Sequence, residues 1–505
     1  MNRRREALTN IFFKYVQIAL SLVTGIVMIP VYLHYISPSD YGAWLACFSV
    51  VVWLAVFDPG IGNILIQKIS AAVGRKDFES INVYLTVGLS VSILVSFIVI
   101  CIGWLGANTA ISSLGFVDKN AKLVEAFRIA AVSTGFILIG YALVGANYAL
   151  HASTSVGITY VAATILKITT ILILLKTGYG FVSLAYGELV SSSMILLFSF
   201  FNLIYRLHVL GVKGRLSFEK GTELLGLFSI SFGARLSKLI VRNLDNVFIA
   251  RAVGAEAVAM YSITATVPRQ TENIIGQPVA ALRPVIAHLS GSADLTSAHH
   301  FVTRLLRVVI WVLGLIIAGL WLFNTDFIRL WVGQKLFAGY AVNYLLVGLF
   351  FLHVWINVFG MLGFSLGDIR RNNKFEIIYA ILLIPALWLG ASAYGLLGVV
   401  GAHILVILST TAWYFPLSII KLLKMDNKII ISLTMTTLKS LCTSFAVILL
   451  FSMVEINGWI SFITWLLCMC TAYFLILFIL EAELRREFYN ASRLITTNLR
   501  SYSKK

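Results

Sequence analysis

Apolar runs long enough to cross a lipid bilayer recur from end to end of this chain, and they constrain its fold more than any other feature. A spanning helix needs about 20 mostly apolar residues. Of the 505 residues, 59% are hydrophobic and only 12% are charged, whereas a soluble domain would carry about 25% charged residues. A membrane barrel would show short alternating segments instead. The sequence therefore predicts an all-α polytopic membrane protein.

About fourteen runs qualify as membrane-spanning helices by length and hydropathy. Their predicted extents are 11–33, 42–67, 81–106, 122–148, 154–176, 180–208, 222–250, 256–289, 300–324, 337–366, 374–394, 396–422, 430–454 and 458–481. The loops between them are too short to form a soluble catalytic domain, so the sequence predicts a transporter and not an enzyme.

Membrane topology accounts for most of the net charge of +17. Cytoplasmic loops of membrane proteins collect Lys and Arg. With the N-terminus placed inside, about 24 basic residues fall on the cytoplasmic side and about 6 on the outer side. Both termini are therefore expected in the cytoplasm, and the basic excess needs no nucleic-acid partner.

The chain also contains an internal repeat. Tyr41 matches Tyr261 and Gly180 matches Gly395 at nearly constant offsets of about 215–220 residues. Each copy holds six predicted spans, an even number, so the copies run parallel. The predicted divisions are an N-lobe, a linker, a C-lobe, two extra helices and a basic cytoplasmic tail, at 1–208, 209–221, 222–424, 425–483 and 484–505.

Matching prolines lie in the second span of each copy, Pro59 and Pro278. Proline removes a backbone donor and lets a helix bend, and paired breaks in the two halves of a transporter often mark its working site. Both prolines are therefore predicted hinges.

The predicted span 222–250 carries charges where lipid would exclude them. Arg235, Lys238, Arg242 and Asp245 fall within an arc of about 80° on one helix face. A single charge at a helix centre costs about 2.5–3.5 kcal/mol on insertion scales. These residues are therefore expected to face a polar interior. An alternative is that Arg235 or Lys238 pairs with a buried acid on another helix, such as Glu188.

Further charged residues lie inside other predicted spans. The cations form, with Arg235, Lys238 and Arg242, a predicted cationic cavity that would suit a phosphate-bearing anion: Lys167, Arg128, Arg269 and Arg283. The acids are candidates for coupling to H⁺ or Na⁺: Asp58, Glu188, Asp245 and Glu272. Three alternatives stay open. Asp58 could cap the helix that restarts after Pro59. Glu125 and Glu272 could neutralise Arg128 and Arg269 at i,i+3. Lys439 could reach the interface from near a helix end.

No pattern for a metal, cofactor or nucleophile emerges from the sequence. The five cysteines and eight histidines show no zinc spacing, and neither a P-loop nor a nucleophile elbow occurs. No cofactor or metal site is expected.

Several segments resemble the O-antigen and polysaccharide flippases of the Wzx type, members of the multidrug, oligosaccharidyl-lipid and polysaccharide exporter superfamily. The similar segments are YISPSDYGAW followed by FDPGIGNILIQKISAAVGRKD, then NLDNVFIARAVGAEAVAMYSIT, RLWVGQKLF and SLGDIRRNNKFEI. The resemblance covers most of the chain. It is specific for the superfamily and uninformative about which sugars are carried.

The resemblance implies two six-helix lobes around a central cavity that opens alternately to either side. It implies a flippase in the bacterial cytoplasmic membrane that moves an undecaprenyl-pyrophosphate-linked oligosaccharide from the cytoplasmic to the periplasmic leaflet. A monomer is expected, with a polysaccharide polymerase and a chain-length regulator as partners. Another exporter of the superfamily, for cell-wall precursors or drugs, is the alternative, and a polymerase or ligase is a weaker one because no large periplasmic loop is present.

Overall fold

The computed structural model is built of helices, and no strand occurs in the part of the chain that it describes. The described residues are 3–58, 60–116, 120–211, 244–282, 285–286 and 295–489. Within them, 11 helical segments are long and apolar enough to cross a membrane. The prediction of an all-α polytopic membrane protein is confirmed.

The count of fourteen spans stays a prediction. Arg370–Leu422 is one continuous candidate but covers two predicted spans. The predicted span 222–250 lies mostly outside the described residues. The predicted span 256–289 is formed by two shorter helices, α10 (Ala255–Thr264) and α11 (Thr266–Ala281).

Contacts divide the chain into two compact units. Unit 1 comprises Met1–Ser262 and Ala380–Val399, and unit 2 comprises Ile263–Tyr379 and Val400–Lys505. The lobe boundaries predicted from the sequence remain a prediction, because the expected linker and most of the following span lie outside the described residues.

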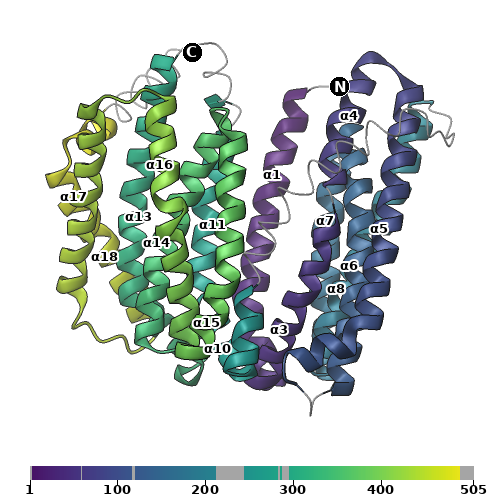
Figure 1. Cartoon of the computed structure of the whole chain (residues 1–505), viewed down its shortest axis with the longest axis horizontal. Helices are drawn as coiled ribbons and strands as arrows, with labels where there is room; N and C mark the ends of the chain where they lie inside the picture. The colour runs from purple at the N-terminus through teal and green to yellow at the C-terminus, as the bar shows by residue number, and fades with distance from the viewer. Residues whose placement is uncertain are drawn as a thin grey trace. The chain divides into compact units, whose positions relative to one another are not determined.

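Unit 1 is a bundle in which α6 contacts α3, α4, α5, α7 and α8, and α1 contacts α7 (Figure 1). Its helices include α1 (Arg3–Leu22), α2 (Met28–Tyr35), α3 (Pro38–Leu54), α4 (Ile61–Arg75), α5 (Phe78–Ser113), α6 (Asn120–Ala149), α7 (Ser153–Lys176), α8 (Val182–Val209) and α10. A π-helical turn, η1 (Val23–Val27), joins α1 to α2. Leu65, Ile69 and Leu143 are fully buried in the core between α4, α5, α6 and α8, whereas Leu105 and Phe201 are exposed, as expected for helices that face lipid.

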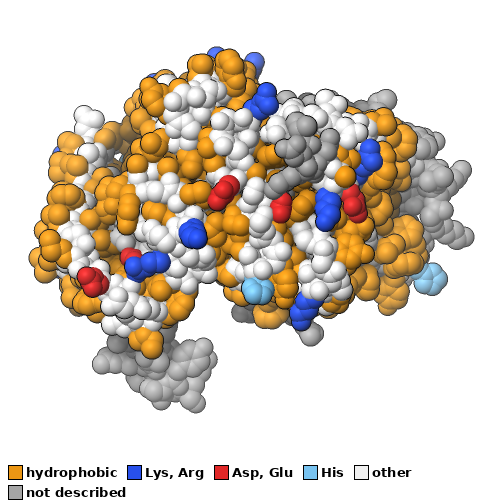
Figure 2. All heavy atoms as spheres, turned by 90° about the horizontal axis from the view of Figure 1, so that it is seen from below, with side chains coloured by type: hydrophobic (Ala, Val, Ile, Leu, Met, Phe, Trp, Pro, Cys, Tyr) orange, Lys and Arg blue, Asp and Glu red, His pale blue; other side chains and the backbone are white. Residues whose placement is uncertain are grey.

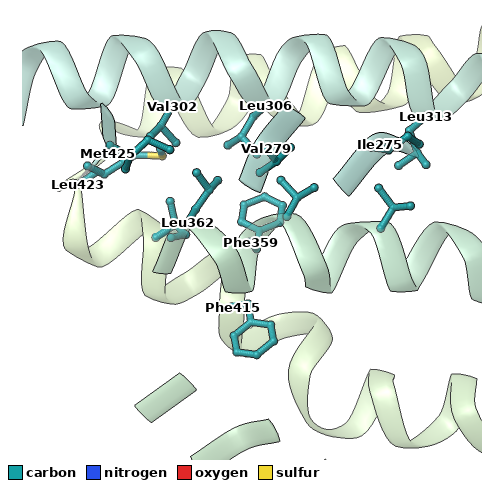
Figure 3. Close-up of a cluster of buried hydrophobic side chains, with 14 of the residues drawn as sticks. Ile275, Val279, Val302, Leu306, Leu313, Phe359, Leu362, Phe415, Leu423 and Met425 are labelled. Carbon is teal, nitrogen blue, oxygen red and sulfur yellow. The ribbon is translucent and has the colours of Figure 1, made fainter. Parts of the chain in front are cut away.

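Unit 2 is built around α13 (Leu295–Trp331) and α14 (Tyr340–Ser365). Figure 3 shows its main core, where Val279 of α11, Leu306 of α13 and Phe359 of α14 pack together. Further helices are α16 (Thr411–Leu422), α17 (Asn427–Phe451) and α18 (Trp459–Leu480). Short 3₁₀ turns occur at η2 (Ala55–Phe57) in unit 1 and η4 (Gln334–Leu336) in unit 2.

The two C-terminal helices are fastened to α13 by hydrogen bonds to its backbone. Ser440 and Ser444 of α17 donate to the carbonyls of Ile310 and Gly314, at 3.0 and 2.7 Å. The Tyr473 hydroxyl of α18 donates to the Trp311 carbonyl at 2.8 Å. Small and hydroxyl-bearing residues let helices approach closely in a membrane, so α13, α17 and α18 form one closely packed group.

The turn glycines of the predicted repeat both have a positive φ angle. Gly180, which precedes α8, has φ 58°, and Gly395 has φ 57°. Gly395 is the non-helical residue inside α15 (Ile369–Ser409), which is therefore two helices joined by a turn. Residues with a Cβ rarely adopt this left-handed region. This conformational match agrees with the predicted repeat.

Candidate functional site

The cations that most strongly predicted a cavity lie outside the described residues. This applies to Arg235, Lys238, Arg242 and Arg283. On the face drawn in Figure 2, Lys, Arg, Asp and Glu side chains are scattered among hydrophobic and uncharged ones, some of them as adjacent groups of opposite charge. The central cationic cavity therefore stays a prediction. The candidate site consists of the described polar residues of each unit.

Lys167 and Glu188 form an ion pair inside unit 1. Lys167 lies in the middle of α7 and its Nζ contacts Glu188 Oε1 on α8. The two side chains are 24% and 28% exposed. The acid that was considered as a partner for Arg235 or Lys238 is thus bound to Lys167, because α7 and α8 are packed neighbours. Their roles in substrate binding and ion coupling remain predictions.

Asp245 and Asn246 anchor the helix preceding α10. The Tyr261 hydroxyl donates to Asp245 Oδ2 at 2.6 Å, and Asp245 is 6% exposed. Asn246 donates to Ser49 Oγ of α3 at 3.0 Å and accepts from Ser262 at 3.1 Å. Asp245 therefore has a buried phenol as a partner, which stabilises a carboxylate away from water.

Asp58 serves as a cap at the break in the predicted second span. Its Oδ1 accepts from the backbone N–H groups of Gly60 and Ile61 at 2.9 and 3.2 Å, where α4 begins. These are the donors that a helix N-terminus leaves without partners. The capping alternative thus has direct geometric support. Pro59 itself lies outside the described residues.

Arg128 lies against Trp104 of α5. Its guanidinium carbon is 5.2 Å from the indole centroid, and its Nε donates to the Trp104 carbonyl at 3.3 Å. Glu125 instead accepts from the Tyr186 hydroxyl at 3.3 Å, so the i,i+3 pair considered for Glu125 and Arg128 does not form. A cation over an aromatic face is stabilised by the ring quadrupole.

The helix break in the span 256–289 lies at Ala265, not at Pro278. Pro278 lies inside the continuous helix α11, whereas α10 ends at Thr264 and α11 begins at Thr266. Pro268 explains this position, because a proline removes the hydrogen bond to the carbonyl four residues earlier and clashes with it. That carbonyl belongs to Thr264.

Side chains from neighbouring helices satisfy two carbonyls that prolines release in unit 2. Asn324 Nδ2 of α13 donates to the Thr264 carbonyl at 3.1 Å. Trp355 Nε1 of α14 donates to the Ala412 carbonyl at 3.3 Å, four residues before Pro416. An unsatisfied backbone group in a membrane costs several kcal/mol. Both released carbonyls are therefore satisfied within the fold, and sequence reasoning did not single out Pro268 or Pro416.

Glu272 belongs to a titratable cluster in unit 2. Asn357 of α14 donates to Glu272 Oε1 at 2.6 Å, and His353 Nδ1 of α14 lies 3.5 Å from Glu272 Oε2. The His353 ring meets the His403 ring edge to face, with centroids 5.9 Å apart. Tyr379 Oη lies 2.9 Å from His403 Nδ1. Helices α11 and α14 and the two helical halves of α15 thus converge on one polar cluster.

The sequence itself indicated this cluster, although its histidines have no zinc-binding spacing. Ionisable residues within apolar spans, histidine included, are rare and mark functional sites. His353 and His403 both lie inside candidate membrane spans. Arg269, one turn before Glu272 on α11, is exposed. Among the residues that the structure describes, no group of three His, Cys, Asp or Glu side chains could hold a metal ion.

Lys439 lies in the middle of α17, further from a helix end than expected. Its Nζ is 3.4 Å from Glu481 Oε2, which is almost fully buried. Nearby, Arg307 of α13 contacts Glu483 at 3.1 Å and donates to Ser432 at 3.1 Å. These ion pairs add to the hydrogen bonds that hold α17 and α18 against α13.

Long apolar helices with paired charges and proline breaks in their interiors define a polytopic membrane transporter. The model of the family described as polysaccharide biosynthesis protein matches residues 35–338. This is more than half of the chain, and the chain belongs to this family. The sequence resemblance to polysaccharide exporters is confirmed.

Solved structures share the fold at low sequence identity. The lipid II flippase MurJ in an inward closed conformation matches with a TM-score of 0.71 and 14% identity, over 96% of this chain and 99% of that one. An inward-facing multidrug resistance MATE transporter of the MOP superfamily matches with a TM-score of 0.66 and 16% identity, over 81% and 96%. An outward-facing one matches at 0.56 and 15%, over 83% and 96%.

These similar structures are transporters and flippases by their titles, in agreement with the prediction of a transporter and not an enzyme. No curated protein matches the chain. The chain thus belongs to the polysaccharide biosynthesis family and shares the fold of solved flippase and exporter structures, and it carries many helices that could span a membrane.

Proposed function

We propose that the chain translocates an undecaprenyl-pyrophosphate-linked oligosaccharide from the cytoplasmic to the periplasmic leaflet of the bacterial inner membrane. Membership of the polysaccharide biosynthesis family carries this proposal. The substrate of such a protein is a sugar chain on a polyprenyl carrier, and its polar head is too large and charged to cross a bilayer unaided. Both termini lie in the cytoplasm in this proposal.

The extent of the structural similarity supports a lipid-linked substrate over a drug. The lipid II flippase matches over 96% of this chain, whereas the MATE transporters match over 81% and 83%. A cell-wall precursor flippase remains the second candidate function for the same reason. An organic cation would be repelled by a cavity with surplus positive charge.

The proposed mechanism is alternating access, with the pyrophosphate bound by the basic face of residues 222–250. Arg235, Lys238 and Arg242 are the principal proposed ligands, because guanidinium and ammonium groups form charge-assisted hydrogen bonds to phosphate oxygens. Lys167 would contribute only if its pair with Glu188 opened. A transmembrane H⁺ or Na⁺ gradient would drive the cycle. A polymerase and a chain-length regulator are proposed partners of a monomer.

The test is complementation of a bacterial strain that lacks its own flippase, with surface polysaccharide and membrane protein level measured together. A charge-assisted hydrogen bond contributes about 1.5–3 kcal/mol, so Lys238→Ala and Arg235→Ala should each weaken substrate binding about tenfold to a hundredfold. Lys238→Arg keeps the charge and should retain much of the activity. Leu236→Ala, on another face of the same predicted helix, is the matched control.

Two outcomes would contradict the proposal. Normal polysaccharide at normal protein level in both alanine variants would remove the basic face from substrate binding. Failure of the wild-type chain to restore polysaccharide, with restoration of growth in a strain depleted of its lipid II flippase, would transfer the function to the second candidate.

A further inference from the structure

We propose that Glu272, His353, His403 and Tyr379 form a proton-binding site in unit 2 that couples transport to the proton gradient. This inference rests on the proposed function for its physiological meaning, but the site itself is defined by geometry. It assigns the proton as the coupling ion. It also adds three residues to Glu272, which is one of the four acids that the sequence suggested.

The arrangement of the cluster gives a proton two acceptors that face each other. Glu272 Oε2 and His353 Nδ1 are 3.5 Å apart, which exceeds an ordinary hydrogen bond of about 2.7–3.2 Å. Binding of one proton to His353 Nδ1 forms one N–H bond and turns the neutral ring into an imidazolium that donates to Glu272. A charge-assisted hydrogen bond of this kind is about 2.7–2.9 Å long. Loading would therefore draw α14 toward α11.

The same step changes the net charge of the pair. With His353 neutral, Glu272 is a carboxylate supported by the Asn357 amide at 2.6 Å. With His353 protonated, the two side chains form a neutral pair. Both are largely shielded from solvent, since Glu272 is 16% exposed and His353 is 27% exposed. The pair thus changes its charge by one unit on loading, as a coupling site must.

His403 and Tyr379 extend the cluster on α15. His403 is 2% exposed and lies within hydrogen-bonding distance of the Tyr379 hydroxyl at 2.9 Å. Its ring contacts the His353 ring edge to face. The Tyr379 hydroxyl donates to or accepts from His403 Nδ1 according to the tautomer of that ring, so this pair would position the His353 ring and offer a second site for the proton. Binding of the proton can then change how α11, α14 and α15 pack against one another.

The chemistry of the partners favours a proton over a sodium ion. Hard cations are bound by several oxygen ligands. Asn357 presents its amide nitrogen to Glu272, and His353 presents a ring nitrogen. The helices that pack here carry these other charged or titratable side chains: Arg269 on α11, Tyr340 and Tyr344 on α14, Arg370, Arg371, Lys374, Glu376 and Tyr394 on α15, Tyr414 and Lys421 on α16, and His299, His300, Arg304, Arg307, Asp326 and Arg329 on α13.

The first arm of the test uses purified wild-type protein in lipid nanodiscs without substrate. Infrared difference spectra between pH 5 and pH 8 report carboxylate and imidazole bands. We expect His353→Gln to abolish a carboxylate change and Glu272→Gln to abolish an imidazole change, because the two groups share one proton. Asp326→Asn, which alters a carboxylate paired with Arg329 in the same unit, is the matched control and should leave both bands unchanged.

The second arm measures surface polysaccharide and protein level in the complemented strain. Glu272→Gln and His353→Gln should lower polysaccharide at least tenfold at normal protein level. His353→Lys keeps a permanent cation beside Glu272, so a purely structural ion pair would retain activity, whereas a proton-loading site would lose it.

Three results would overturn the inference. These are infrared changes that survive in both glutamine variants, changes that follow sodium concentration at constant pH, and full activity of His353→Lys. Failure of the wild-type chain to restore polysaccharide would instead count against the proposed function, and the infrared result would stand independently of it.

Discussion

Asn324 of α13 donates a hydrogen bond of 3.1 Å to the Thr264 carbonyl. Pro268, four residues further on, has no backbone N–H to donate to this carbonyl within the helix. The same Asn324 amide donates to Asn343 Oδ1 of α14 at 2.7 Å. One side chain thus joins a broken helix to two neighbours. This relationship links Pro268 to the point at which the helix is interrupted between α10 and α11.

A double-mutant cycle tests this link. Asn324→Ala should lower the free energy of unfolding by about 1–2 kcal/mol, because the Thr264 carbonyl and the Asn343 amide oxygen both lose their donor. In a Pro268→Ala background the loss should be smaller, since residue 268 then carries an N–H that can bond Thr264. Thermal unfolding in detergent measures both. Asn343→Ala is the control, because Pro268→Ala should not reduce its effect. Equal losses in both backgrounds would contradict the assignment.

A second prediction concerns the Lys167–Glu188 pair. Either Lys167→Met or Glu188→Gln alone leaves its partner uncompensated between α7 and α8, and should lower the unfolding temperature. The double substitution should recover much of the loss, because a buried pair is often replaceable by apolar groups while a lone charge is not. Thermal unfolding of the four proteins checks this order. A double variant as unstable as the worse single one would show that the pair does not act as a unit.

A third prediction concerns how α17 and α18 pack on α13. A Cβ at Gly314 would lie well inside van der Waals contact with Ser440 Oγ and Tyr473 Oη. Gly314→Ala should therefore disrupt the hydrogen bonds to the α13 backbone and increase labelling of Cys470, which is half-buried on α18. Gly319→Ala is the matched control, because its Cβ would meet only Met469 Cε at 3.4 Å. Equal labelling rates in the two variants would contradict the proposed packing.

A fourth prediction concerns topology. Reporter fusions in the turns at Gly115 and Asn457 should report the periplasm, and fusions at Lys76 and Lys424 should report the cytoplasm, as the Lys and Arg distribution requires. All four positions lie at or beyond helix ends. A cytoplasmic signal at Gly115 together with a periplasmic one at Lys76 would invert the assignment.

Hydropathy predicted most elements of this fold, because lipid offers no hydrogen-bond partners to the backbone. Each span must therefore be an apolar helix whose N–H and C=O groups bond to one another. Pairings between helices follow no such local rule. Glu188 pairs with Lys167 across two helices, and no residue spacing along the chain indicates that contact.

Proline positions show the same limit. Pro278 and Pro268 both lie in α11, yet the helix is interrupted only near Pro268. The carbonyl that Pro268 releases has a donor on a neighbouring helix, the Asn324 amide of α13. That information belongs to packing, and the sequence of one span does not contain it. His353 and His403 were recognisable as residues out of place in lipid, but their meeting required the fold.

Gly180 and Gly395, which match in the predicted repeat, have nearly equal positive φ angles of 58° and 57°. A gene that duplicates is free to exchange most side chains, since many apolar residues fill a helix face equally well. A turn whose handedness excludes a Cβ has no such freedom. In the predicted repeat, glycines at positive φ are therefore the positions expected to stay matched after most side chains have been exchanged.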